Sequence, residues 1–337
     1  MPTNNQNNQN SLNRSQHPST QTSRTAETQI QTTAMKKTAM RRTVIKDLFC
    51  LLFAGVFCAG MSPLTAVPPA TGVPPPSAQS TPSPKTPQAI YVVFIGDSIT
   101  AGALVPAPKE NAPPAKAAAW LAKQSAVELR GFSNQGVSGY TTVDFLPSRQ
   151  KVFQRVERAA ARFAREDETA RTSGDRKGKA AATLVFSVML GTNDSACSGT
   201  NGAPVSPEHY HANLTALINA LAKRFPNSVF VLHNPLWYSP STHNGARYLQ
   251  EGLTRLESYA PKLRELADAR TASHTGKVFL GDTEAFGFFK ANAAENFVHE
   301  KGRSGQFYLH PNRVGAAKLG EFWAKAILRT LENKTKT

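Results

Sequence analysis

The stretch Ala89-Ile90-Tyr91-Val92-Val93-Phe94-Ile95-Gly96-Asp97-Ser98, residues 89–98, decides the fold of this 337-residue chain. Its first seven residues form an apolar run rich in β-branched and aromatic side chains, as expected of a strand that is buried on both faces. Such strands belong to parallel sheets with helices on either side. The run ends at Gly96, and polar residues follow at once. The stretch therefore predicts an inner strand of a parallel sheet with a polar turn at its carboxyl end.

The sequence downstream repeats this alternation of strand and helix patterns. Apolar runs of strand length recur at 183–190, 229–232 and 278–280. Helical spacing of apolar residues is found at 117–129, 152–163, 207–224, 247–267 and 314–331, and the first of these is expected to lead into a second short strand. The charged segment 166–179 is predicted to be a solvated loop. We therefore predict an α/β fold: a single three-layer α/β/α domain over residues 88–337 with a mainly parallel, flavodoxin-like sheet.

The residues before this domain are predicted to contain a targeting signal and a spacer. Residues 1–34 are almost entirely small or polar, so they are expected to be disordered or untranslated. Residues 35–61 combine a basic start with a short apolar stretch, which is typical of a secretory signal peptide. Residues 62–87 hold nine of the 23 prolines and are expected to form an extended linker.

Two details of the signal segment leave the mode of export open. The adjacent Arg41 and Arg42 resemble a twin-arginine export motif, and Cys58 leaves open whether the segment is lipidated. The expected location is secreted or periplasmic, with the N-terminal segment either cleaved or serving as an envelope or membrane tether.

The chain is strongly basic, with 39 Lys and Arg against 23 Asp and Glu and a formal net charge of +16. Residues 1–86 contain eight basic and two acidic side chains, which leaves +10 on the remaining 251 residues. These cations are scattered over the predicted helices without interleaved aromatic residues, so no nucleic-acid partner is expected. An acidic glycan or an anionic envelope would be attracted to such a surface. Cys197 is the single cysteine of the predicted domain, so no internal disulfide is expected.

Four short polar motifs follow predicted strands or precede the last helix, where ligands bind in an open α/β sheet: 96–100 (GDSIT), 134–139 (NQGVSG), 191–194 (GTND) and 310–312 (HPN). A serine becomes a nucleophile when an imidazole accepts its proton, so Ser98 and His310 are the candidate catalytic pair. Taken alone, Ser98 could instead cap a helix and His310 could be an ordinary surface residue. The other seven histidines show no metal-ligand spacing, so no metal is proposed.

In this order the four motifs resemble the SGNH (GDSL-like) hydrolase family, and the resemblance covers about residues 88–332. It implies a serine ester hydrolase without a cofactor. It also implies an oxyanion hole made of the Ser98 backbone N–H, the Gly136 backbone N–H and the Asn193 side-chain amide, with the glycine allowing close approach of the substrate. Three further residues are expected to order their turns, the last two by Asx-type hydrogen bonds: Asp97, Asn134 and Asp194.

The sequence departs from the family at one position. The family's final motif has Asp three residues before its histidine, and Phe307 stands there in this chain. Three accounts are open. A backbone carbonyl orients the imidazole and leaves a Ser-His dyad, or the enzyme is impaired, or a carboxylate arrives from elsewhere, with the candidates Glu295, Glu300 and Asp282. We favour the dyad, because the third member of such a triad orients the imidazole rather than accepting a proton.

The expected function is that of an exported serine esterase that removes a small acyl group, most simply acetyl, from a carbohydrate. Its partner would be a small-molecule or polysaccharide ester. A lysophospholipase or arylesterase of the same family is an alternative, and the Ala- and Pro-rich insertion at 103–118 could shape an acyl pocket. A non-catalytic glycan-binding module that kept the fold and lost the acid is a further alternative.

Overall fold

The computed structural model describes residues 86–272 and 277–334, which belong to one compact unit spanning Gln79–Thr337. The segments predicted to be disordered (1–34) and a signal peptide (35–61), and nearly all of the predicted linker at 62–87, lie outside the described residues. Within the described part, no helix combines the length and the apolar character that crossing a membrane requires.

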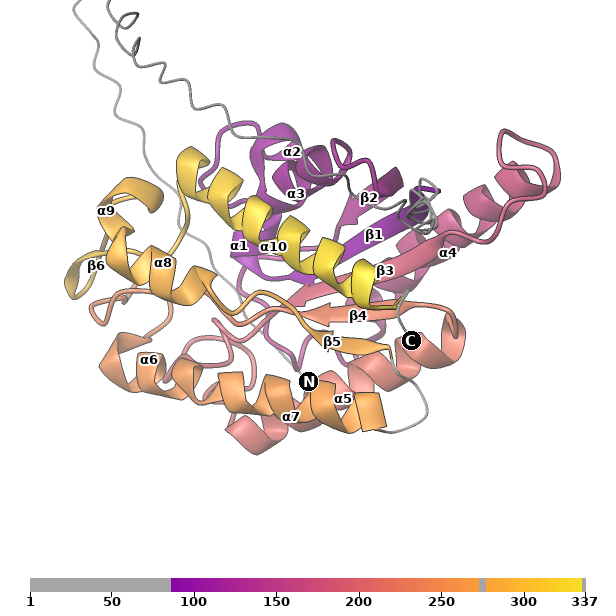
Figure 1. Ribbon diagram of the computed structural model, residues 1–337. Helices are drawn as coiled ribbons and strands as arrows, with labels where there is room; N and C mark the ends of the chain where they lie inside the picture. The colour runs from indigo at the N-terminus through magenta and orange to yellow at the C-terminus, as the bar shows by residue number, and fades with distance from the viewer. Residues whose placement is uncertain (1–85, 273–276, 335–337) are drawn as a thin grey trace, which may run out of the picture. The chain divides into compact units, whose positions relative to one another are not determined.

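Five strands form the central sheet: β1 (Gln88–Gly96), β2 (Val127–Asn134), β3 (Thr183–Met189), β4 (Val229–Leu232) and β5 (Val278–Leu280). Each pairs in parallel with its neighbours, in the order β2-β1-β3-β4-β5 (Figure 1). This is the flavodoxin-like order. The predicted α/β class with a mainly parallel sheet is therefore confirmed, and β4 and β5 have the predicted bounds.

Helices cover both faces of this sheet, and the longer ones are α3 (Pro113–Leu121), α4 (Gln150–Thr172), α5 (Pro207–Arg224), α6 (Leu249–Glu257), α7 (Tyr259–Ala272) and α10 (Arg313–Lys334). The Tyr91 ring of β1 stacks on Phe163 of α4, with ring centroids 4.7 Å apart. The Phe94 ring of β1 stacks on Trp323 of α10, with centroids 6.0 Å apart. Because side chains alternate along a strand, Tyr91 and Phe94 point to opposite faces. The two helices therefore lie in different layers, as the three-layer prediction requires.

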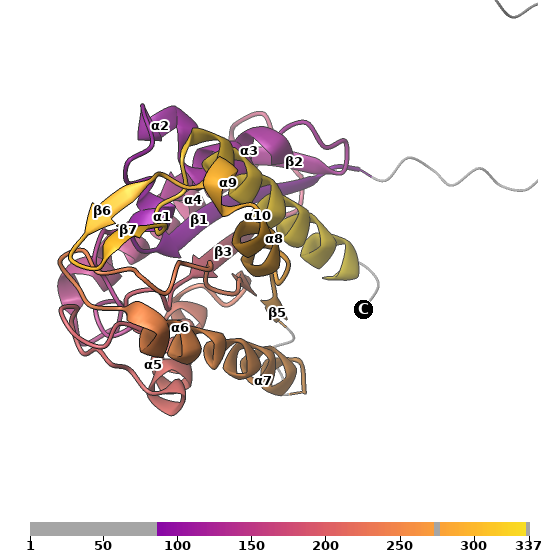
Figure 2. The same ribbon diagram turned by 90° about the vertical axis from the view of Figure 1, so that its left-hand side faces the viewer.

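Shorter elements complete the fold: α1 (Ser98–Ala101), α2 (Pro108–Asn111), α8 (Ala285–Ala291), α9 (Ala293–Asn296), and the antiparallel strands β6 (Glu300–Gly302) and β7 (Gly305–Phe307). Figure 2 shows that the hairpin of β6 and β7 lies close to α1, near the carboxyl end of β1. Apolar periodicity did not predict these elements, because each is too short to display it.

The helix predicted over 117–129 is wrong in its second half. α3 ends at Leu121, and β2 begins at Val127, which pairs with Gln88 of β1. Leu129 pairs with Ile90 of the same strand. Val127 and Leu129 are spaced by the two-residue period of a strand. The prediction extended the helix over them because they follow closely after the apolar residues of α3.

The helix predicted over 247–267 is divided into α6 and α7 at Ser258. Pro261 explains the break, because it has no backbone N–H for the carbonyl of Glu257, and its ring would collide with that carbonyl in a continuous helix. The Ser258 hydroxyl and backbone N–H both donate to the Arg255 carbonyl oxygen, at 2.6 and 3.1 Å, and close the end of α6.

The segment 166–179 is only in part the solvated loop that its charge predicted, since most of its residues are exposed but two charged side chains are buried. Its first seven residues form the end of α4, and the Asp167 carboxylate forms a buried ion pair with the Arg176 guanidinium. Asp167 also accepts the Ala182 backbone N–H at 3.0 Å, just before β3. Charge alone did not predict this buried pair, because an acid and a base nine residues apart neutralise one another only when the chain turns back.

Candidate active site

Ser98 is the first residue of α1, and only Asp97 separates it from the end of β1. The Asp97 carboxylate accepts the Ile99 backbone N–H at 2.9 Å and so caps this helix. Asp97 thus orders the turn, as expected, and the cap role considered for Ser98 belongs to its neighbour. The Ser98 hydroxyl is left to face another part of the chain.

That other part is His310, whose Nε2 lies 2.9 Å from the Ser98 Oγ. Both side chains are buried. The Val298 backbone N–H donates to the His310 carbonyl oxygen at 2.9 Å, and Asn312 caps the first turn of α10 through Oδ1, which accepts the Val314 and Gly315 N–H groups. The loop that carries the imidazole is therefore held at both sides, and the predicted pair meets across 212 residues of sequence.

The other nitrogen of the ring lies against a carboxylate. His310 Nδ1 is 3.0 Å from both Oε1 and Oε2 of Glu300, and the His310 backbone N–H donates to Glu300 Oε1, also at 3.0 Å. The favoured expectation of a dyad oriented by a backbone carbonyl is therefore wrong. A carboxylate at Nδ1 selects the tautomer with hydrogen on Nδ1 and the lone pair of Nε2 directed toward Ser98.

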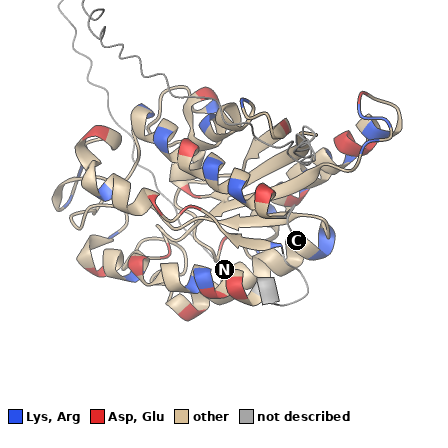
Figure 3. Cartoon of the chain, in the orientation of Figure 1, with Lys and Arg blue, Asp and Glu red and all other residues tan. Residues whose placement is uncertain are grey.

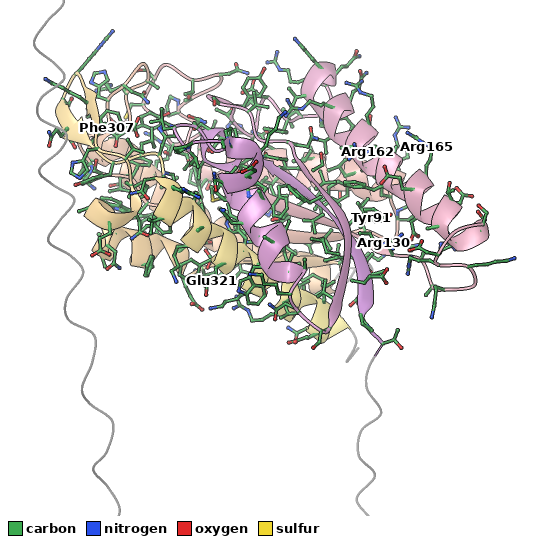
Figure 4. The ribbon with its side chains drawn as sticks, turned by 90° about the horizontal axis from the view of Figure 1, so that it is seen from above. Tyr91, Arg130, Arg162, Arg165, Phe307 and Glu321 are labelled. Carbon is green, nitrogen blue, oxygen red and sulfur yellow. The ribbon has the colours of Figure 1, made fainter. Side chains whose placement is uncertain are left out.

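Glu300 reaches the imidazole through the β6–β7 hairpin. In this hairpin Glu300 pairs directly with Phe307, the residue at the position where the family has Asp. The Phe307 side chain is buried, and Figure 4 labels it on this hairpin, at the left of the view. The acid is thus supplied by the strand opposite the usual position. Gly302 ends β6 and Gly305 begins β7 with a φ of 94°, and these two glycines around a two-residue turn are the sequence signal that could have predicted the hairpin.

The two other candidate acids have different surroundings. The Asp282 carboxylate accepts the backbone N–H groups of Glu284 and Ala285 at the start of α8. The Glu295 side chain is exposed. Neither is among the hydrogen-bond partners of His310 in the described part of the chain.

Gly136, one of the proposed oxyanion donors, lies in a tight Asx turn. Its backbone N–H donates to Asn134 Oδ1 at 2.9 Å, which is the Asx-type bond expected for Asn134. Asn134 Nδ2 donates to the Thr100 carbonyl oxygen at 2.8 Å and ties the turn to α1. A Cβ at position 136 would overlap the backbone of Ala101, so glycine is needed for this packing. A substrate oxyanion would have to share the Gly136 N–H with Asn134.

The Asn193 amide is held between two tyrosines. Its Nδ2 donates to the Tyr140 carbonyl oxygen at 2.9 Å, and its Oδ1 accepts the Tyr248 hydroxyl at 2.7 Å. A carbonyl cannot donate, so the nitrogen must face Tyr140, and this determines the orientation of the amide. The second hydrogen of Nδ2 remains for an oxyanion. Neither tyrosine was identified from the sequence, because no motif contains them.

We expect Tyr248→Phe to lower kcat on a small aryl acetate by about tenfold while KM changes little, because the buried Asn193 oxygen loses the donor that fixes its amide. Steady-state kinetics measure both constants. Tyr238→Phe is the matched control, since its hydroxyl contacts Ser195 and its ring packs 5.3 Å from that of Tyr248. An unchanged kcat in Tyr248→Phe, or an equal loss in the control, would contradict this positioning role.

Asp194 supports a different loop from the one expected. Its carboxylate accepts the backbone N–H of Thr142, 52 residues earlier, at 3.0 Å, and also accepts the Thr142 hydroxyl. Asn213 Nδ2 donates to the same hydroxyl at 2.9 Å. Burial raises the pKa of Asp194 to about 7, against the hydrogen bonds from Thr142, and the Asp97 carboxylate adds to the rise. Burial likewise raises the pKa of Asp97 to about 6.

These raised pKa values predict a pH-dependent stability. An unfolded Asp titrates near pH 3.9, so the folded state binds the Asp194 proton more tightly, and stability from this group falls as the pH rises from about 4 to about 7. We expect Asp194→Asn to flatten the dependence of the free energy of unfolding on pH between about 5 and 7, measured by urea titration. The exposed Asp268→Asn serves as control. A slope in Asp194→Asn equal to that of the wild type would refute the assignment.

A second serine–histidine pair lies in the core and has a structural role. Ser187 Oγ is 2.8 Å from His233 Nε2, and His233 Nδ1 accepts the Asp282 backbone N–H at 3.0 Å. Burial lowers the pKa of His233 to about 3, so the ring is neutral, and Nε2 donates to the serine. The Ser187 hydroxyl therefore accepts a hydrogen bond from the ring, and Nε2 has no lone pair free to take the serine proton. Across residues 86–272 and 277–334, no three His, Cys, Asp or Glu side chains are grouped as a metal site would require.

A serine, a histidine and a glutamate in hydrogen-bond contact at the carboxyl edge of a parallel sheet define a serine hydrolase. Residues 94–318 match the GDSL-like lipase/acylhydrolase family, and the chain belongs to that family. It is a serine ester hydrolase.

Solved structures with a similar chain path include a lipolytic protein of the G-D-S-L family from Veillonella parvula, with 15% identity over 71% of this chain and 99% of that one, and a TM-score of 0.42. The lipase/acylhydrolase from Enterococcus faecalis is 18% identical over 70% and 94%, with a TM-score of 0.42. The acetylxylan esterase Axe2 from Geobacillus stearothermophilus is 19% identical over 73% and 95%, with a TM-score of 0.43. A search of curated protein sequences found no match.

Proposed function

We propose that this chain is an exported serine esterase that hydrolyses a small acyl ester, most simply an acetyl ester, on a carbohydrate. The observation that carries the catalytic part is the chain of contacts from Ser98 Oγ to His310 Nε2 and from His310 Nδ1 to Glu300. Export and the carbohydrate substrate are supported by the signal-like segment at 35–61 and the proline-rich linker that follows it.

In the first half of the reaction, Ser98 Oγ attacks the ester carbonyl carbon while its proton moves to His310 Nε2. Glu300 keeps the other proton at Nδ1 and stabilises the imidazolium that forms. The imidazolium then gives its Nε2 proton to the ester oxygen of the sugar, and the sugar leaves with a free hydroxyl group. The acyl group stays on Ser98 as an ester.

In the second half, water takes the place of the sugar. His310 accepts a proton from the water as it attacks the acyl carbon, and the carboxylic acid leaves when Ser98 Oγ recovers its proton. In both halves a tetrahedral oxyanion develops. Its donors in this proposal are the backbone N–H groups of Ser98 and Gly136 and the free amide hydrogen of Asn193.

The test is a panel of acetylated polysaccharides, assayed for released acetate by the wild-type protein, together with aryl esters of increasing acyl length. We expect acetate release from at least one polysaccharide and the highest kcat/KM at the shortest acyl chain. A preference for long acyl chains, without acetate release, would favour the lysophospholipase alternative.

A non-catalytic glycan-binding module is the alternative from a different class. This alternative rested on the absence of an acid at position 307, where the chain has Phe. The Glu300 carboxylate, which contacts His310 Nδ1, speaks against it. An organophosphonate probe that reacts with activated serines separates the two ideas. Labelling of the folded protein at neutral pH, found by mass spectrometry on the peptide that contains Ser98, supports the esterase. Absence of labelling would favour the binding module.

A further inference from the structure

A small cavity lies beside the turn of Asn134 and Gly136, and the mechanism does not use it. It has a volume of 230 Å³ and is bounded by residues of α1, α2, α3, the end of β2 and the turn after it: Ala101, Pro108, Lys109, Ala115, Phe132, Asn134 and Gly136. Ligand sites for drug-sized molecules occupy roughly 300–1,000 Å³. This cavity is therefore of a size for one small unit, such as a single sugar ring.

Its position is within reach of an ester bound at Ser98. Ala101 follows Ser98 by one helical turn of α1, which places it about 4.5 Å farther along the helix axis. Gly136 and Asn134 form the turn that supplies a proposed oxyanion donor, and both also line the cavity. A sugar unit in the cavity would thus be a neighbour of the unit whose ester is cleaved.

Two side chains give the cavity its chemical character. Phe132 is 36% exposed, which is unusual for a large aromatic residue in this domain, and its outer surface offers a flat apolar platform. Lys109 is exposed and has no ion-pair partner among the described residues. Its sequence neighbour Glu110 is not part of the lining. Lys and Arg elsewhere are spread over the outer helices with acids among them (Figure 3).

The wall that presents Lys109 is held in a strained backbone. Leu104 and Ala107 have φ values of 63° and 47°, in the left-handed region that residues other than glycine rarely adopt. Asn111 Nδ2 donates to the Pro106 carbonyl oxygen at 2.8 Å and closes this loop. Such strain persists where the surroundings enforce it and is concentrated at functional sites. The loop is thus built to hold one shape beside the catalytic serine.

We propose that this cavity is a subsite for a sugar unit that carries a carboxylate, so that the substrate is an O-acetylated acidic polysaccharide. The apolar C–H face of the sugar ring packs on Phe132, and the carboxylate pairs with the Lys109 ammonium. This inference rests on the proposed esterase function and adds to it the charge of the substrate. A neutral polysaccharide and an anionic phospholipid are the competing ligands that the test must separate.

The test compares an O-acetylated acidic polysaccharide with the same polymer after its carboxyl groups are reduced to alcohols. We expect Lys109→Gln to lower kcat/KM on the acidic polymer by about threefold, the effect of a solvent-accessible ion pair, and to leave the reduced polymer unaffected. Lys123→Gln is the matched control, because this exposed lysine precedes β2 and therefore lies at the opposite end of that strand. Equal effects of Lys109→Gln on both polymers, or none on either, would overturn the inference.

A second variant tests the aromatic wall. Phe132→Leu keeps apolar volume against Phe94, whose ring centroid is 6.4 Å away, and removes the flat ring. We expect a loss of several fold on both polymers and none on methyl acetate, which is too small to reach the cavity. An equal loss on methyl acetate would count against the subsite.

The outcomes also separate this inference from the proposed function. Hydrolysis of methyl acetate with a preference for the reduced polymer would leave the esterase standing and overturn the acidic subsite. A preference for anionic phospholipid vesicles over both polymers would overturn it in favour of a lipid headgroup. No ester hydrolysis at all, with no phosphonate labelling of Ser98, would overturn the proposed function itself.

Discussion

Replacing Glu300 by Gln is expected to lower kcat on a small aryl acetate by about 10³–10⁴-fold, with the fold intact. The carboxylate of Glu300 accepts hydrogen bonds from both the backbone N–H and the Nδ1–H of His310. In Glu300→Gln the single side-chain oxygen would stay with the backbone N–H, so the amide nitrogen would face Nδ1 and donate to it. The imidazole would then carry its hydrogen on Nε2, facing Ser98, and could no longer accept the serine proton. Steady-state kinetics with circular dichroism as a folding check measure the effect.

Two amide variants serve as controls for this result. Glu295→Gln changes an exposed acid in the same region of the chain and is expected to keep full activity. Asp282→Asn is expected to affect stability, because this carboxylate accepts backbone N–H groups at the start of α8. Full activity in Glu300→Gln would support a Ser-His dyad without an acid. A loss in Glu295→Gln as large as that in Ser98→Ala would identify Glu295 as the acid.

Ser98→Ala is expected to reduce kcat by about a million-fold, because removing the nucleophile of such a triad costs about as much as removing all three members. Some catalysis over the rate in water should remain, since the oxyanion donors and substrate binding are unaffected. Release of aryl alcohol measures the rate. The variant should also fail to react with the organophosphonate probe.

Ser187→Ala is the informative control, because the Ser187 Oγ likewise lies within hydrogen-bond distance of a histidine Nε2, at 2.8 Å. The neutral His233 donates to Ser187, so this pair cannot activate a nucleophile. We therefore expect Ser187→Ala to keep its activity and its phosphonate labelling. Labelling that persists in Ser98→Ala and disappears in Ser187→Ala would show that the wrong pair has been assigned.

The sheet was predictable from the sequence because its strands are buried on both faces. Continuous apolar runs such as those of β3 and β4 stand out from their surroundings, and α5 has the predicted bounds of 207–224. Prediction failed where a local pattern had two readings. Val127 and Leu129 suit both a strand and the end of a helix, and only their pairing with β1 selects the strand. The charges of 166–179 predicted a solvated loop, and most of these residues are exposed, but 166–172 are helical and Asp167 pairs with Arg176 in the interior.

By itself the sequence determined the α/β fold and the candidate pair of Ser98 and His310, because each follows from a motif at the end of a strand or before a helix. It named Glu300 as one of three acids without selecting it. That selection depends on the register of the β6–β7 hairpin, which brings an acid ten residues before the histidine onto its ring. Two further contacts also depend on the packing of distant segments: the Tyr248 hydroxyl at Asn193, and Lys109 in the cavity beside the turn of Asn134 and Gly136. Tertiary structure decided these because contacts between distant segments depend on the packing of the whole domain, and no local pattern records them.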